Sequence, residues 1–225
     1  MTDKKKVSIE LPAPEFTTFD LVLAGTTPLI TDSFSEPRKA AFARTQDGSA
    51  KQKPGPRDPD AEFHESMYRT EDGRYGIPKL AFRKAFQAGA MRMTDIKGTV
   101  ALAAFQINTP DEVLVIESPE PKMRTDHVVR VGRGNLVYRA EFWPWKVRLP
   151  IRLDHEVVSL EQFAHVVYKS GMGVGIGNWR PEKRGDFGCW TIEAIENVQV
   201  SHSAEEEAKS RTNGHRETRI LQEVK

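Results

Sequence analysis

Cysteine is almost absent from this chain, and its scarcity excludes proteins held together by internal disulfides and small zinc-binding proteins. Cys189 is the one cysteine among 225 residues, so no disulfide can form within the chain. No histidine or second cysteine stands at the spacing of a zinc finger or knuckle, so we expect no metal and no cofactor. A lone thiol fits the reducing cytoplasm, and we expect a cytoplasmic protein.

Long hydrophobic runs are missing as well. No apolar run approaches the roughly 20 residues that span a bilayer. The first residues, MTDKKKVSIELPAPE, are charged and lack the apolar stretch of a signal peptide. We therefore expect neither contact with a membrane nor export.

The net charge is small, at +1, but it is unevenly distributed. Residues 122–153 contain eight Lys and Arg against two acidic residues, a net charge of +6. Acidic residues gather elsewhere, as in the run from Glu205 to Glu207. This pattern predicts a positive stripe on one face, which is typical of proteins that bind phosphate backbones.

The most informative segment, SGMGVGIGNWRPEKRGDFGCW, runs from Ser170 to Trp190 and is rich in both glycine and charge. Glycine frees backbone N–H groups to point outward and lets another backbone approach, which suits a phosphate chain. The cations Arg180, Lys183 and Arg184 add positive charge. The glycines of this predicted loop are Gly171, Gly173, Gly175, Gly177, Gly185 and Gly188.

A dinucleotide-binding loop is the competing interpretation, and it requires GxGxxG after a strand and before a helix. Here the order is reversed. The preceding SLEQFAHVVYKSG has a capping box at Ser159 and Gln162 and helical apolar spacing, so it predicts a helix. The following CWTIEAIENVQV mostly alternates and predicts a half-buried strand. This order disfavours a nucleotide cofactor.

The remaining periodicity predicts an α+β protein. A first strand is expected over residues 17–29, and an amphipathic helix in KLAFRKAFQAGAMRM from Lys79. Further strands are expected over 99–107, 112–117, 135–142 and 146–153. The order of strand, helix, several strands, helix and strand predicts a ferredoxin-like (RRM-like) core with extra strands.

Flanking and inserted segments complete the expected organisation. We expect a flexible basic arm over 1–15, a single domain over 16–200 and a charged tail over 201–225. Residues 33–74 hold prolines and mixed charges with little periodicity, which predicts a long insertion with a short helix near 38–44.

Two of these segments resemble a known family. YGIPKLAFRKAF after a long loop, together with GIGNWRPEKRGDFG, resembles the RAMP superfamily of CRISPR ribonucleoproteins. The likeness is greatest to the backbone subunits, which place a long thumb-like insertion where residues 33–74 lie. Those subunits have small residues and glycine after the IP, whereas this chain has Lys79, Leu80 and Ala81, so its helix supplies the basic groups Lys79 and Arg83. The stretch from VVRVGRGNLVYRAEF to GVGIGNWRPEKRGDFG also resembles uncharacterised proteins of tailed phages.

Basic and aromatic side chains supply what binding of unpaired nucleic acid requires, namely phosphate contacts and stacking. Arg130, Arg133 and Arg139 bracket the glycine-interrupted segment VGRGN. Stacking candidates are Phe142, Trp143, Trp145 and Trp179, with Trp143-Pro144-Trp145 expected as a hairpin turn. A solvated basic face with tryptophans in the core is the alternative. The expected contacts are Lys79, Arg83, Arg130, Arg133, Trp179, Arg180, Lys183 and Arg184.

Catalysis is the other alternative that the sequence leaves open. The resemblance implies a histidine acid or base near the glycine loop, for which His127 and His155 are the candidates, and a target-cleaving aspartate near Asp32. His165 falls within a predicted helix and is interpreted as a packed or surface residue. The segment RDPDAEFHE matches no metal-binding loop, and we interpret it as an acidic patch that contacts a basic face of a neighbouring copy.

Three functions follow from these observations. The first is binding of RNA or single-stranded DNA, without sequence preference, as a repeating backbone subunit of a ribonucleoprotein or nucleoprotein filament. The second is a phage-encoded single-stranded DNA-binding or structural assembly protein. The third is a metal-independent RNA-processing endoribonuclease. The expected partners are therefore RNA or single-stranded DNA and further copies or subunits.

Overall fold

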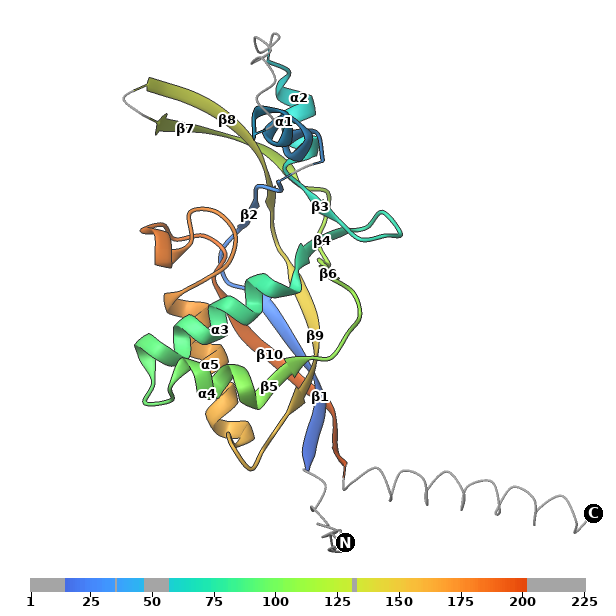
Figure 1. The fold of residues 1–225 in the computed structure, drawn as a ribbon, viewed down its shortest axis with the longest axis vertical. Coiled ribbons are helices and arrows are strands. Elements are labelled where there is room, and N and C mark those ends of the chain that lie inside the picture. Colours follow the sequence, from blue (N-terminus) through green and yellow to red (C-terminus); the bar gives the residue numbers. More distant parts are fainter. Residues whose placement is uncertain (1–14, 35, 47–56, 131–132, 202–225) are drawn as a thin grey trace, which may run out of the picture.

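A four-stranded antiparallel sheet with strand order β10-β1-β9-β5 lies at the centre of the molecule (Figure 1). The computed structural model describes residues 15–34, 36–46, 57–130 and 133–201, with side chains described except at 36–38, 41, 45, 130, 133 and 201. The strands of the central sheet are β1 (Phe16–Gly25), β5 (Phe105–Ile107), β9 (Lys146–Leu153) and β10 (Trp190–Ser201).

Helices α3 (Lys79–Met93) and α5 (Leu160–Gly173) cover one face of this sheet, and α4 (Gly98–Ala104) lies beside α3 (Figure 1). The two long helices approach closely because Gly89 faces Ser170, where an added Cβ would lie 2.0 Å from the Ser170 hydroxyl oxygen. Small residues at such a crossing let the helix axes come together.

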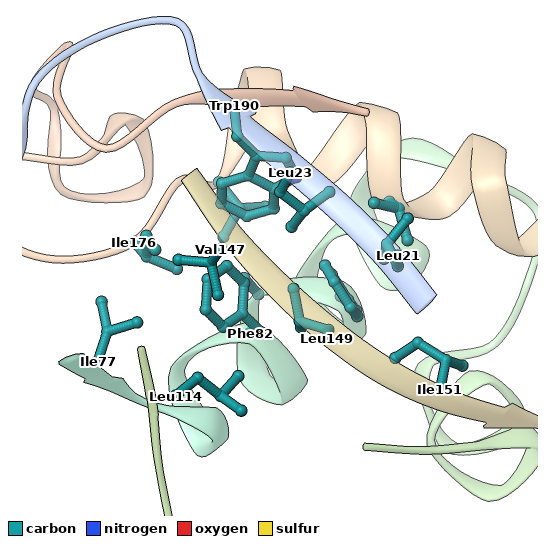
Figure 2. Close-up of a cluster of buried hydrophobic side chains, with 14 of the residues drawn as sticks. Leu21, Leu23, Ile77, Phe82, Leu114, Val147, Leu149, Ile151, Ile176 and Trp190 are labelled. Atoms are coloured by element: carbon teal, nitrogen blue, oxygen red, sulfur yellow. The ribbon is translucent and has the colours of Figure 1, made fainter. Parts of the chain in front are cut away.

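The core lies between these helices and the sheet. Side chains that alternate along β1 and β9 point toward Phe82 of α3 and Trp190 of β10 (Figure 2). An aromatic cluster extends this contact, with the Phe105 and Phe163 ring centroids 5.2 Å apart. The residues labelled in Figure 2 are Leu21, Leu23, Ile77, Phe82, Leu114, Val147, Leu149, Ile151, Ile176 and Trp190, all of them buried. The period of two that buries one face of β1 and β9 leaves Asp20, Lys146 and Arg148 on the opposite face, here called the open face.

Two smaller antiparallel sheets flank the central one. The first has the order β2-β8-β7 and comprises β2 (Leu29–Thr31), β7 (Lys122–Arg130) and β8 (Arg133–Phe142). The second has the order β3-β4-β6 and comprises β3 (Tyr68–Arg69), β4 (Tyr75–Pro78) and β6 (Val113–Val115). Strands β7 and β8 form a long hairpin that projects beyond the central sheet (Figure 1).

Two helices precede β3 in the chain, α1 (Glu36–Gln46) and α2 (Pro59–Glu65). Helix α2 packs against β8, where the Ala140 backbone N–H donates to the Ser66 hydroxyl at 2.8 Å. The short helix expected near residues 38–44 is thus confirmed as α1. The described residues 57–74 have more structure than predicted, because α2 packs against β8 and β3 pairs with β4, both outside this segment.

The predictions of an α+β protein and of a capping box at the start of α5 are confirmed. The chain is a mixed α+β protein with several antiparallel sheets and, within its described part, five α-helices. The capping box at the start of α5 is present: Gln162 N–H donates to the Ser159 hydroxyl at 3.2 Å, and Ser159 N–H donates to Gln162 Oε1 at 3.0 Å. No helix in the described ranges is long and apolar enough to cross a membrane.

The prediction of a strand over residues 99–107 is wrong over most of its length. Residues 98–104 form helix α4, and only Phe105–Ile107 pairs as β5. Gly98, Ala101 and Ala104 are the buried residues of α4, and a Cβ on Gly98 would lie 2.2 Å from Met91 Cγ. Packing of this small-residue face against its neighbours overrides the weak local preference for a strand.

Two turns also differ from expectation. The strand predicted over 17–29 divides at Gly25, and residues 29–31 join a different sheet as β2. The segment Trp143-Pro144-Trp145, which contains a cis peptide bond at Pro144, is not a hairpin turn, because β8 and β9 belong to different sheets. It carries the chain from one sheet to the next.

The predicted arm over 1–15, except Glu15, and the predicted tail over 201–225, except Ser201, lie outside the described residues.

Candidate nucleic-acid interface

The glycine loop, defined by the structure as residues 174–189, folds onto itself and onto the start of β2. Gly188 N–H donates to the Pro28 carbonyl at 2.8 Å, and Asn178 N–H donates to the Ile30 carbonyl at 2.8 Å. The N–H groups of Gly175 and Gly185 likewise donate to carbonyls of the protein, at 2.9 and 3.1 Å. These N–H groups are therefore not free to hold phosphate, and contacts to a ligand fall to the side chains of the loop.

Gly171 and Gly173 were expected in the loop but lie within the last turn of α5. Their small size serves packing, because a Cβ on Gly171 would lie 2.2 Å from the Trp190 carbonyl oxygen and one on Gly173 would lie 2.1 Å from Met93 Cε. Gly185 shows the same close approach in the loop, where a Cβ would lie 1.8 Å from the Trp179 carbonyl oxygen.

Gly188 combines two demands on the backbone, and we predict that Gly188→Ala destabilises the protein by about 2 kcal/mol. Its φ of 66° lies in the left-handed region, and a Cβ would lie 1.9 Å from the Ile176 carbonyl oxygen. Gly73 is the matched control, because its φ is 84° but nothing lies within 4 Å of its Cβ position. Gly73→Ala should cost about 1 kcal/mol. Urea unfolding measures both, and equal losses would show that the Ile176 contact relaxes at no cost.

A group of charged residues, two of them buried, joins the base of the β7–β8 hairpin to the glycine loop and to the end of β2. Asp126 and Arg139 are only 7% and 5% exposed. Arg139 Nη1 donates to Asp126 Oδ2 at 3.3 Å, and Arg139 Nε and Nη2 donate to Asp32 Oδ2 at 3.0 and 2.9 Å. The remaining contacts of Asp126 come from Arg124 Nε at 2.7 Å and from the Trp179 indole N–H at 3.0 Å. We call these five residues the Asp126 network.

Arg124 extends the junction along the hairpin. It donates to Glu141 on the neighbouring strand at 2.9 Å, and its guanidinium lies 4.6 Å from the Phe187 ring centroid in the glycine loop. Residues about 50 positions apart in sequence are thus held together, and the loop lies beside the base of the hairpin (Figure 1). The glycine loop is therefore attached to the base of the hairpin.

The predicted binding residues of the glycine loop differ in exposure and in pairing. Lys183 and Arg184 are exposed and, among the described residues, form no ion pair. Trp179 is 37% exposed. Arg180 is held instead within the loop, where it donates to the Gly177 carbonyl at 2.9 Å and pairs with Glu182 at 2.8 Å. Burial raises the pKa of the Glu182 carboxyl, but the hydrogen bond and charge of Arg180 and the charge of Arg92 outweigh it, and that pKa lies below its ordinary value.

Arg130 and Arg133 are register partners at the outer end of the hairpin. Their side chains lie outside the described part of the chain. Alternation along β7 puts Arg124 and Asp126 on one face of the ribbon, the face that meets the glycine loop at its base.

The two predicted cations of α3 lie elsewhere and hold neighbouring segments. Lys79 Nζ donates to the Thr109 carbonyl at 3.0 Å and pairs with Glu112 at 3.2 Å. Arg83 donates to the Leu102 carbonyl at 3.2 Å, which fixes α4 beside α3. The structure does not bring these two residues together with the glycine loop in any contact described.

The four stacking candidates divide into two groups. Phe142 and Trp145 are core residues, and the Trp145 indole N–H donates to the Thr27 carbonyl at 2.8 Å. They are therefore not stacking platforms. Trp143 and Trp179 remain exposed, and only Trp179 lies in the glycine loop.

The candidate catalytic residues take part in separate contacts. His155 Nδ1 lies 2.9 Å from the Thr17 hydroxyl and its Nε2 lies 3.6 Å from Glu15, at the start of β1. Asp32 is bound by Arg139 after β2, and His127 is exposed on β7. General acid–base catalysis needs both groups within reach of one substrate. The contacts described do not bring Asp32 and His155 to one place.

The charged side chains at the start of α2 make contacts within their own segment. Asp58 caps the helix, since its carboxylate accepts from Asp60 and Ala61 N–H at 3.0 and 3.1 Å, and Arg57 pairs with Glu62 at 2.5 Å. Among the residues that the structure describes, no group of three or more His, Cys, Asp and Glu is placed to hold a metal ion.

The open face of the central sheet carries compensated charge. Lys146 pairs with Glu193, and Arg148 pairs with Glu196 at 2.6 Å and with Asp20 at 3.6 Å.

A cleft of about 920 Å³ lies between this face and the β3–β4 turn. Six carboxylates and three arginines line it, namely Asp20, Glu71, Asp72, Asp111, Glu112 and Glu117 against Arg69, Arg74 and Arg148. Such a lining repels a phosphate backbone.

Comparisons with known proteins give a distant likeness only. No family model matches the chain, and no curated protein matches it. Among solved structures, the chain is similar to one in the cryo-EM structure of the Type III-B Cmr-beta bound to cognate target RNA, with a TM-score of 0.40 and 14% identity. The match covers 84% of this chain and 62% of that one. A likeness at this level assigns no function.

Proposed function

We propose that this protein binds RNA or single-stranded DNA without strong sequence preference, through the surface formed by the β7–β8 hairpin and the glycine loop. We call this the hairpin–loop surface, and its proposed contacts are Arg130, Arg133, Trp179, Lys183 and Arg184. The observation that carries the proposal is the distribution of free charge. Lys183 and Arg184 form no described ion pair, whereas Lys146 and Arg148 on the open face are neutralised by carboxylates.

The fold supports this placement. We infer a ferredoxin-like (RRM-like) core, because its elements follow the order β1, α3, β5, β9, α5, β10 and its sheet the order β10-β1-β9-β5. Domains of the RRM type stack bases on their open sheet face. In this chain that face borders an acidic cleft, so the nucleic acid is assigned to the hairpin–loop surface instead.

The aromatic and basic groups of the hairpin–loop surface suit an unpaired strand. Cations follow the phosphates and supply affinity that depends on salt, while an exposed indole stacks with any base. Both contributions are insensitive to sequence. Lys79, Arg83 and Arg180, which the sequence also suggested, make contacts within the protein and are left out of the proposed interface.

A repeating assembly is the second part of the proposal, and it rests on the resemblance to RAMP backbone subunits. The hairpin, together with α1 and α2, projects from the central sheet as a thumb would (Figure 1). Phe34 and Phe42 are both more than half exposed on this projection, with ring centroids 6.2 Å apart. Exposed aromatic pairs of this kind are typical of contacts with a partner.

Purified protein tests both parts. We expect a raised 260/280 nm absorbance ratio and a large particle that shrinks after treatment with nuclease and high salt. A nucleic-acid-free particle of unchanged size would favour a structural assembly protein.

The contribution of the hairpin end is tested separately. Arg130→Glu with Arg133→Glu should weaken oligonucleotide binding and lower the slope of log affinity against log salt by about 1.4. Unchanged binding of the Arg130/Arg133 variant at low salt would remove the hairpin end from the interface.

A further inference from the structure

The backbone of Trp179 adopts a strained conformation that the packing of its side chain does not explain. Its φ is 53°, in the left-handed region that residues other than glycine rarely adopt, and it is 37% exposed. The carbonyl of Trp179 accepts from Phe187 N–H at 3.0 Å, which fixes its backbone. Strained residues of this kind tend to lie where a particular orientation serves function.

Asp126 fixes the other end of the same residue. Its Oδ2 accepts from the indole N–H at 3.0 Å, so the edge of the ring is anchored to the hairpin. With backbone and indole edge both bound, the ring cannot turn into the protein or swing freely outward. The exposed part of the ring is therefore presented in one orientation, in the same loop that carries the exposed Lys183 and Arg184.

The charged groups around the buried Asp126 point to positioning as well. Arg124 and Arg139 both donate to Asp126, at 2.7 and 3.3 Å, and Asp32 binds Arg139 from the other side. Buried ion pairs are often no more stable than well-packed apolar residues of similar size. Two arginines that converge on the buried Asp126, each also bound by a second carboxylate, are thus better explained by the need to hold Asp126 in place.

We propose that Asp126, oriented by Arg139 and Arg124, is a positioning residue that holds the Trp179 indole as a stacking platform for one unpaired base. This inference rests on the proposed function. It narrows the ligand to strands with accessible bases, because a base within a duplex cannot stack on a side chain without leaving its neighbours.

Acrylamide quenching tests the positioning without any ligand. In a Trp143→Phe background, Trp145 and Trp190 are buried, so quenching reports mainly on Trp179. Asp126→Leu removes the acceptor but leaves Arg139 paired with Asp32 and Arg124 paired with Glu141. We expect its quenching constant to rise by about twofold, because the freed ring becomes more exposed. Asp126→Asn keeps an acceptor oxygen and should restore the parent value.

Oligonucleotide binding then tests whether Trp179 serves as a stacking platform. Asp126→Leu should weaken binding of a single-stranded oligonucleotide by about tenfold, and of the same backbone with abasic sites by less than about twofold. Glu141→Gln is the matched control, because Glu141 also pairs with Arg124 but has no described contact with Trp179, and it should change neither measurement. A purely structural role for Asp126 would weaken both ligands equally.

A second variant keeps the test decisive if Asp126→Leu does not fold. Trp179→Phe removes the N–H while leaving the carboxylate in place, and it should produce the same loss of base-dependent affinity. A folded Asp126→Leu protein with unchanged quenching and unchanged base-dependent binding would overturn the inference, as would wild-type affinity in Trp179→Phe. If the wild-type protein binds neither oligonucleotide, the proposed function fails, while quenching still decides whether Asp126 positions Trp179.

Discussion

Replacing Lys183 and Arg184 together with glutamine will weaken binding of a single-stranded oligonucleotide by about 25-fold near 0.1 M salt. Each phosphate contact to a single strand contributes about 0.7 to the slope of log affinity against log salt, so the slope should fall by about 1.4. Both residues are exposed and unpaired among the described residues, so their loss removes binding groups without breaking internal contacts. A salt titration by fluorescence anisotropy measures both quantities.

The open face provides a control of equal charge. Lys146→Gln with Arg148→Gln also removes two positive charges, but these neutralise Glu193, Glu196 and Asp20 beside an acidic cleft. This pair should change affinity by less than about twofold, because exposed ion pairs contribute little to stability and these cations lie away from the proposed interface. Equal losses of affinity in the two variants would show that binding follows the net charge of the protein and not the hairpin–loop surface.

Arg139→Met will destabilise the protein by about 3 kcal/mol, the largest loss of stability that we predict. Arg139 is 5% exposed and is the bridge between Asp32 and Asp126. Removing Arg139 leaves the carboxylates of Asp32 and Asp126 with fewer hydrogen-bond partners at a site that water reaches poorly. The free-energy cost of a buried carboxylate that has lost its partner exceeds the stabilisation that the intact ion pair provided. Urea unfolding followed by circular dichroism measures the change.

Arg124→Met is the control for this prediction. Arg124 also donates to Asp126, but its side chain is 32% exposed, so water can replace part of what it provides. We expect a loss of about 1 kcal/mol. If Arg139→Met costs no more than Arg124→Met, the carboxylates of Asp32 and Asp126 find other partners and the network is not the structural link between hairpin and loop.

Periodicity predicted the elements whose burial follows local pattern. Helix α3 shows its apolar face in the spacing of Phe82, Phe86 and Ala90, and the start of α5 is marked by its capping box. Strands β9 and β10 likewise follow the alternation of their side chains. In each case, residues within one helical turn or a few positions of one another are enough to indicate the element.

The predictions failed where distant segments decide the outcome. Gly171 and Gly173 look like loop residues, but Trp190 and Met93 pack where their side chains would be. Strand β7 was missed because Arg124, Asp126 and His127 do not form an apolar alternation. Its signal was present as opposite charges facing one another, since Arg124 and Glu141 lie on neighbouring strands of the same hairpin.

The candidate site shows the same division. Composition and order along the chain suffice to indicate a basic middle, a glycine-rich segment and an α+β protein, because these depend on residue type and local spacing. Which cations stay free for a ligand depends on the carboxylates that the fold brings beside them. Arg148 meets Glu196 across 48 positions, and Arg139 meets Asp32 across 107. An ion pair depends on the distance between two groups in space and not on their separation along the chain, so no pattern along the chain reveals these pairs.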